Sequence, residues 1–177
     1  AKGHQMEKAL DLLIKMRELV LEPNVITFNA TISACEKAGQ PEKAVQLLAE
    51  MREQALKPNV ISFNTSISAC EKCEQPEMAL ELLAMMPEQR LEPDVISYNA
   101  AISACQKGQQ VEKALQLLAK VQQRDNRLEP DLITFNAAIS ACSQGKRPQK
   151  ALELLAQMRE QGLVPNVITY SAAISAC

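Results

Sequence analysis

The chain of 177 residues is poor in histidine, tryptophan, glycine and aromatic residues. It contains one histidine, His4, no tryptophan, five glycines and few aromatic side chains. A single histidine, without a pair of carboxylates placed to share a pocket, cannot form a catalytic constellation. The sequence therefore predicts a protein that is not an enzyme and that needs no cofactor.

Long apolar runs and a strong net charge are also missing. No stretch approaches the ~20 apolar residues of a transmembrane helix, so we expect no membrane span. The formal net charge is -2, and the global basic signal that often marks nucleic-acid binders is therefore absent. No signal or transit segment is visible in the sequence.

The most prominent feature of the sequence is one string that occurs five times. PNVITFN begins at Pro23, and close variants begin at Pro58, Pro93, Pro130 and Pro165. The steps are 35, 35, 37 and 35 residues, and a fixed period in this range is typical of stacked structural repeats. The longer step is explained by a two-residue insertion within 124–127, which we expect to be a loop.

This period divides the chain into four full repeats between two partial ones, in one continuous array. The predicted segments are a second helix at 1–24, repeats at 25–59, 60–94, 95–131 (with the insertion) and 132–166, and a first helix at 167–177. A chain that begins and ends within a repeat is typical of a piece of a longer array.

Each repeat is predicted to form two helices. From Val25 to Cys35 apolar residues recur at i, i+3, i+7 and i+10, which is the spacing of one helical face. Asn24 after Pro23 is a favourable N-cap residue. The second helix is expected to begin near Pro41 and to end near Ala55. Met6 and Val111 replace this proline in two of the units.

Paired amphipathic helices at this period predict an all-α fold, a right-handed α-solenoid of stacked helix-turn-helix repeats with about ten helices. The tetratricopeptide pattern needs a tryptophan and a Leu-Gly pair in its first helix, and neither is present. All aromatic residues lie on the core face, so an open platform for stacking bases is not expected. They are Phe28, Phe63, Tyr98, Phe135 and Tyr170.

The cysteines follow the repeat as well. Five of them occupy one repeat position: Cys35, Cys70, Cys105, Cys142 and Cys177. The sixth, Cys73, forms a lone CxxC with Cys70, but a zinc site needs a second ligand pair that the sequence lacks. We therefore expect reduced, metal-free cysteines buried on a helix face, which fits an intracellular compartment.

A second face of the first helix pairs an aliphatic residue with a polar one in every repeat. The pairs are Ile26 with Asn29, Ile61 with Asn64, Ile96 with Asn99, Ile133 with Asn136, and Ile168 with Ser171. One such asparagine could serve a local backbone hydrogen bond. Four at one position, each near an exposed isoleucine, indicate a surface for flat ligands with polar edges, such as nucleobases.

The strings VITFN, ISAC-x-K, PEKAL-x-LL and L-x-P-N/D closely resemble the pentatricopeptide repeat (PPR) family over the whole chain. The resemblance implies a protein that binds single-stranded RNA along a concave surface lined by first helices, one base per repeat. It also implies a role in organellar RNA processing or stability, in a chloroplast or mitochondrion. The alternative is a structural or protein-binding solenoid, a subunit of a large organellar assembly with other proteins as partners.

By this resemblance two side chains per repeat read each base. The pairs are Asn29 with Asn59, Asn64 with Asp94, Asn99 with Asp131, and Asn136 with Asn166. In the family Asn with Asp favours U, Asn with Asn favours C or U, and Thr with Asp prefers G. The implied target is C/U-U-U-C/U. The second member of each pair is also expected to cap the next helix.

The remaining contacts implied by the family are to the ring faces and the phosphates. The bases would be sandwiched by Ile26, Ile61, Ile96, Ile133 and Ile168. The phosphates would meet a lysine at the end of each first helix, here Lys2, Lys37, Lys72 and Lys107. Gln144 departs from this pattern, although Lys146 and Arg147 are close by in the sequence. Glu36 and Glu71 lie beside these lysines and are expected to weaken phosphate binding.

Overall fold

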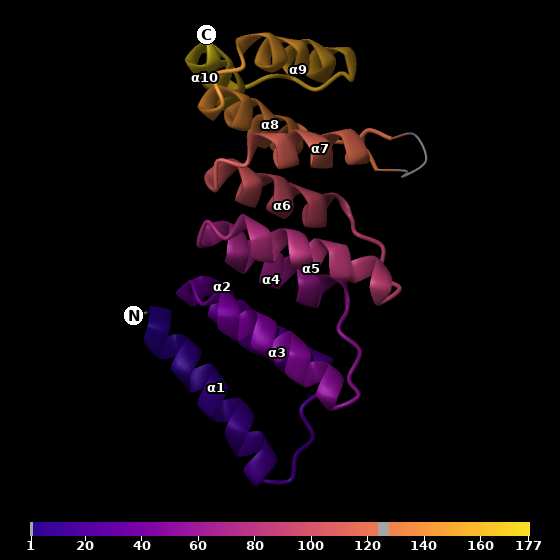
Figure 1. Cartoon of the computed structure of the whole chain (residues 1–177). Helices are drawn as coiled ribbons and strands as arrows, with labels where there is room; N and C mark the ends of the chain where they lie inside the picture. The colour runs from indigo at the N-terminus through magenta and orange to yellow at the C-terminus, as the bar shows by residue number, and fades with distance from the viewer. Residues whose placement is uncertain (1, 124–127) are drawn as a thin grey trace.

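The computed structural model describes residues 2–123 and 128–177, and within these it contains ten α-helices and no strand. The helices stack from one end of the molecule to the other, with the termini at opposite ends (Figure 1). The predicted all-α solenoid is therefore confirmed, while the predicted insertion within 124–127 lies outside the described residues. The helices are α1 (Lys2–Glu18), α2 (Val25–Ala38), α3 (Pro41–Glu53), α4 (Val60–Lys72), α5 (Pro76–Glu88), α6 (Val95–Lys107), α7 (Val111–Val121), α8 (Leu132–Gln144), α9 (Pro148–Glu160) and α10 (Val167–Ala176).

The helices form two layers. Each of α2, α4, α6, α8 and α10 contacts the next in the series, and each of α3, α5, α7 and α9 contacts the two first helices that flank it. Small side chains allow the first helices to approach closely, because Ala101 and Ala104 of α6 and Ala138 and Ala141 of α8 are completely buried. We call the surface of α2, α4, α6, α8 and α10 the first-helix layer.

A capping box begins every first helix. In α4 the Asn59 side-chain oxygen accepts the backbone N–H of Ser62 at 3.0 Å, and the Ser62 hydroxyl accepts the N–H of Asn59 at 3.1 Å. The same exchange occurs at the N-caps Asn24, Asp94, Asp131 and Asn166. A cap of this kind is worth about 1 kcal/mol. It explains why the β-branched VITF string opens a helix and why its third residue always carries a hydroxyl.

The second helices begin as expected, with one exception. Pro41, Pro76 and Pro148 occupy the first helical turn, and α7 begins at Val111 without a proline. In contrast, α1 begins at Lys2, one turn before Met6. Met6 retains the backbone N–H that proline lacks, which permits the helix to continue upstream. Val111 also retains this N–H, but Gln109 just before α7 has a φ of 58° and interrupts the helix there.

The core lies between the two layers. Phe28, Phe63 and Phe135 are completely buried, as predicted, whereas Tyr98 is half-buried and Tyr170 is 41% exposed. Tyr170 therefore departs from the expected packing role. Its ring lies under the Arg159 guanidinium, 5.7 Å from the ring centroid.

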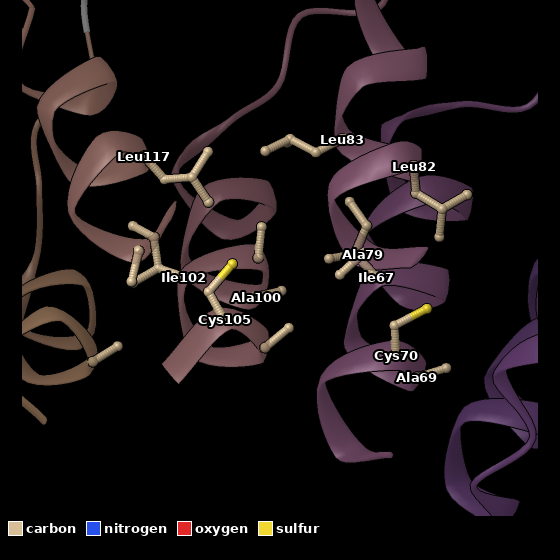
Figure 2. Close-up of a cluster of buried hydrophobic side chains, with 14 of the residues drawn as sticks. Ile67, Ala69, Cys70, Ala79, Leu82, Leu83, Ala100, Ile102, Cys105 and Leu117 are labelled. Carbon is tan, nitrogen blue, oxygen red and sulfur yellow. The ribbon is translucent and has the colours of Figure 1, made fainter. Parts of the chain in front are cut away.

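Four of the repeat cysteines are buried, as expected: Cys35, Cys70, Cys105 and Cys142. Figure 2 shows Cys70 and Cys105 among aliphatic side chains of neighbouring repeats, including Ile67 and Ile102. Burial raises the pKa of Cys70 to about 12 and that of Cys105 to about 11. Cys177 is exposed, so the burial predicted for this repeat position fails there.

The described residues offer neither a metal site nor a membrane-spanning helix. No group of three His, Cys, Asp or Glu side chains in that part of the chain could hold a metal ion. None of its helices combines the length and the apolar character needed to cross a membrane.

Candidate nucleic-acid interface

The first-helix layer carries a row of exposed isoleucines, one from the second position of each first helix. Ile26 is 78% exposed, and the exposure of the others ranges from 58% at Ile133 to 64% at Ile96. They are Ile26, Ile61, Ile96, Ile133 and Ile168. Large aliphatic side chains that stay in solvent at a fixed position form a regular apolar surface, and such surfaces often mark binding sites.

Next to this row each asparagine of the repeated string takes part in a polar cluster with the following repeat. The Asn29 side-chain N–H donates to Asn59 Oδ1 at 3.3 Å, and the Ser62 hydroxyl donates to Asn29 Oδ1 at 2.6 Å. The two residues that the sequence assigned to one base are therefore brought together. A third residue, Ser62, joins them from the repeat that follows.

The same cluster recurs with carboxylate caps. Asn64 donates to Asp94 Oδ1 at 3.0 Å and accepts from the Ser97 hydroxyl at 2.5 Å. In the next repeat Asn99 donates to Asp131 Oδ1 and Oδ2 at 3.0 and 3.1 Å and accepts from Thr134 at 2.6 Å. Consecutive repeats thus share one hydrogen-bonding design.

The last cluster differs. The Thr169 hydroxyl donates to Asn136 Oδ1 at 2.6 Å, and the Thr169 N–H donates to the Asn166 cap at 3.1 Å. The described residues show no direct hydrogen bond between the side chains of Asn136 and Asn166. The Asn136 amide is therefore held by fewer partners than the amide of Asn99.

Asn99 is more deeply buried than the sequence indicated. It is only 7% exposed, although the pattern placed it on a polar face. Its two bonds to Asp131 and the bond from Thr134 draw the amide into the contact between α6 and α8. A substitution of Asn99 would therefore disturb packing as well as any ligand contact.

The caps Asp94 and Asp131 remain ionised to lower pH than ordinary aspartates. Burial by itself would raise the pKa of Asp94, but hydrogen bonds from the Ser97 N–H and the Asn64 amide outweigh it and lower the pKa. The pKa of Asp131 is lowered in the same way, because hydrogen bonds from Thr134 and Asn99 outweigh the effect of burial. These caps are thus acceptor-only anions at neutral pH.

A groove of about 290 Å³ lies where these groups meet. Its lining includes the side chains of Ile96, Ile133, Asn99, Asp131, Asn64 and Glu71. Ile96 and Ile133 come from consecutive repeats, and both line the groove together with Asn99. A second groove of about 430 Å³, next to Ile168 and Ser171, lies further along the layer.

The lysines assigned to phosphates are not all free. Lys72 Nζ lies 2.6 Å from Glu36 Oε1, and Lys107 Nζ lies 3.0 Å from Glu71 Oε1. Each pair joins consecutive repeats. Lys37 is exposed and has no carboxylate partner within the described part of the chain. Two of the four cations therefore already have an anionic partner.

At both ends of the array the lysine pattern fails. Lys2 lies in the first turn of α1, not at the end of a first helix as expected, because α1 extends upstream of Met6. Arg147 forms an ion pair with Glu112, so it is already engaged and does not replace the charge missing at Gln144. Lys37, Lys72 and Lys107 do lie in the last turn of their helices.

The repeat signature is also recognised by family models. The PPR repeat family model matches residues 23–72, 58–107 and 130–177, and the PPR repeat model matches residues 96–126. The chain belongs to the PPR repeat family. No curated protein matches this PPR chain.

Solved PPR structures have the same fold. The chain is similar to the pentatricopeptide repeat protein PPR10 from maize, with a TM-score of 0.80 and 24% identity over 93% of this chain and 23% of that one. It resembles PPR10 in complex with an 18-nt psaJ RNA element, with a TM-score of 0.78 and 24% identity over 98% of this chain and 25% of that one. The chain therefore spans about a quarter of the length of PPR10.

A third similar structure is a shorter PPR domain. The PPR domain of Arabidopsis thaliana protein-only RNase P 1, in complex with tRNA, superimposes with a TM-score of 0.81. It is 16% identical, and the match covers 99% of this chain and 91% of that one. At these identities the likeness demonstrates the solenoid fold alone.

Proposed function

We propose that the chain binds single-stranded RNA along the first-helix layer, one base per repeat, with a preference for C/U-U-U-C/U. The binding units are the repeats 25–59, 60–94, 95–131 and 132–166. The observation that carries the proposal is the groove between Ile96 and Ile133, with the amide of Asn99 at its side. Aliphatic faces with an amide at the edge suit an unstacked base.

Two similar structures support RNA as the ligand. PPR10 is described in complex with an 18-nt psaJ RNA element, and the PPR domain of protein-only RNase P 1 in complex with tRNA. Each binds RNA on a fold that this chain shares. We propose that the array binds RNA without catalysing a reaction, and that it acts in RNA processing or stability in a chloroplast or mitochondrion.

The pairs of residues that would read each base are proposed from the hydrogen-bonded clusters described above. Asn64 with Asp94 and Asn99 with Asp131 would each hold a U, since an amide N–H can donate to a carbonyl oxygen of the base. Asn29 with Asn59 and Asn136 with Asn166 would hold C or U. The test is a titration of the chain against oligo-U, oligo-C, oligo-A and oligo-G at one fixed salt concentration. The account predicts tighter binding of the pyrimidine oligomers, whereas equal affinity for all four contradicts the code.

A structural or protein-binding solenoid is the second candidate. The pairing of Lys72 with Glu36 and of Lys107 with Glu71 favours it, because it reduces the positive charge offered to phosphates. Under this alternative the chain binds none of the four oligomers above non-specific levels, and its partner is another protein of a large assembly.

A further inference from the structure

Each of the four proposed base-reading asparagines accepts a hydrogen bond from a hydroxyl group of the repeat that follows it. They are Asn29, Asn64, Asn99 and Asn136. The donor is always the third residue of the first helix in the next repeat. It is not a member of the proposed base-reading pair. The O–O distances are 2.6 Å for Ser62 with Asn29, 2.5 Å for Ser97 with Asn64, 2.6 Å for Thr134 with Asn99, and 2.6 Å for Thr169 with Asn136. A contact this short, repeated in every full repeat, is a built feature of the array.

The direction of this hydrogen bond follows from the partners. The Ser97 oxygen already accepts the backbone N–H of Asp94 at 3.1 Å, and its single proton can be donated only once. The Asn64 oxygen at 2.5 Å is nearer than the Asp94 carboxylate oxygen at 2.9 Å. The hydroxyl therefore donates to Asn64, which fixes the amide oxygen towards Ser97 and the NH₂ group away from it.

One N–H of that NH₂ group donates to Asp94 at 3.0 Å. The other has no partner in the described residues, so the amide has a donor left for a ligand, while one lone pair of its oxygen is occupied by the hydroxyl. We infer that Ser62, Ser97, Thr134 and Thr169 are positioning residues that determine which end of each amide faces the base. A pyrimidine offers a carbonyl oxygen to such a donor. This inference rests on the proposed RNA binding.

The asparagines do not depend equally on the hydroxyl. Both carboxylate oxygens of Asp131 accept from the Asn99 NH₂ group, and Asp131 has no proton to donate. If the Asn99 amide were flipped, its oxygen would therefore face the carboxylate oxygens. Asn136 lacks a bond of this kind to Asn166, and only the Thr169 hydroxyl holds its oxygen. Loss of the hydroxyl therefore releases the Asn136 amide more completely than the Asn99 amide.

A purely structural role would give a different result. The same hydroxyls complete the capping boxes, so removing one weakens a helix start in any case. A weaker helix lowers the affinity for every base by a similar factor. A misoriented amide instead changes the ratio of affinities between bases, and this ratio is the quantity to measure.

The experiment compares Thr169→Val, which removes the hydroxyl at nearly constant shape, with wild type. The probes are four oligomers, C-U-U-X, in which X is C, U, A or G and occupies the Asn136 site. Wild type should prefer pyrimidines at X by roughly tenfold, the scale of one good base-edge contact. In Thr169→Val this preference should fall at least about threefold. Thr169→Ser should restore it, because Ser97 makes the same bond.

The matched variant is Thr134→Val, tested at the third base, where Asp131 still orients the amide. Thr134→Val should retain more of the preference for pyrimidines at its base than Thr169→Val retains at the fourth base. Equal losses for all four bases in Thr169→Val, or an unchanged preference, would overturn the positioning role. If circular dichroism shows that Thr169→Val has lost helix content, Ser62→Ala is compared with Ser62→Thr at the first base, and the same two outcomes decide. A wild type without base preference overturns the proposed function itself.

Discussion

The Lys72 ammonium of one repeat lies 2.6 Å from the Glu36 carboxylate of the repeat before it. Glu36 also accepts the Ser68 hydroxyl at 3.0 Å, and its side chain is only 16% exposed. The same pairing recurs between Lys107 and Glu71. An RNA phosphate that approaches either lysine must therefore compete with a carboxylate already in place.

Removing one of these carboxylates should strengthen RNA binding at low salt. Each lysine that neutralises a phosphate contributes about 0.7 to the slope of log affinity against log salt. In Glu36→Gln the Lys72 ammonium is released, so the slope should steepen by up to about 0.7 while base preference stays unchanged. The measurement is a titration with a C-U-U-C oligomer at four salt concentrations.

Glu53→Gln is the control for this experiment, because it removes the same charge from the end of the second helix α3. It should leave the slope close to that of wild type. An equal effect of both substitutions would mean that overall charge, and not the Glu36 pair, sets the salt response.

Acid should destabilise the array partly through its carboxylate caps. The pKa values of Asp94 and Asp131 are lower in the folded chain than in ordinary aspartates. The unfolded state then takes up protons first, so the stabilisation is complete above a pH of about 4 and is lost as the pH falls through the folded pKa. The double variant Asp94→Asn, Asp131→Asn should lose less stability than wild type between about pH 5 and pH 3, as measured by urea unfolding. This range extends about one pH unit to each side of the pKa of an ordinary aspartate.

Asparagine already caps helices at Asn59 and Asn166, so the double variant should fold. An identical acid response in the variant and in wild type would contradict the assignment of this pH dependence to Asp94 and Asp131.

Thiol reactivity should divide the cysteines by burial. Burial raises the pKa of Cys70 to about 12 and that of Cys105 to about 11, so almost no thiolate is present at neutral pH and neither sulfur is accessible. Iodoacetamide should modify the exposed Cys177 in the folded chain and leave Cys70 and Cys105 unmodified. In urea all six cysteines should react. Rapid modification of Cys70 by iodoacetamide in the folded chain, detected by mass spectrometry, would contradict this burial.

The period and the capping chemistry of the sequence were sufficient to predict the fold. Proline, a cap residue and a hydroxyl at fixed spacing specify where α2, α4, α6, α8 and α10 begin. The start of α1 was mispredicted, because Met6 resembles the other helix starts only by alignment and does not block the helix as proline does.

The contacts between repeats were harder to predict. Glu36 and Lys72 are 36 residues apart, and their pairing depends on the offset with which α2 and α4 stack. The burial of Asn99 and the hydroxyl bonds of Ser62 and Thr134 depend on the same offset. The recurrence of Ser or Thr at the third position was visible in the sequence, but a helix cap alone was enough to account for it.

Base reading by the asparagines is the central claim, and Asn64 tests it with less structural cost than Asn99, since it is only half-buried. Asn64→Thr creates a Thr–Asp pair with Asp94, which in the PPR family prefers G. The decisive measurement is a two-by-two set of affinities, wild type and Asn64→Thr against C-U-U-C and C-G-U-C. The account predicts that the variant loses about 1 to 3 kcal/mol on C-U-U-C and recovers much of it on C-G-U-C. An equal loss on both oligomers, or no loss on either, would contradict it.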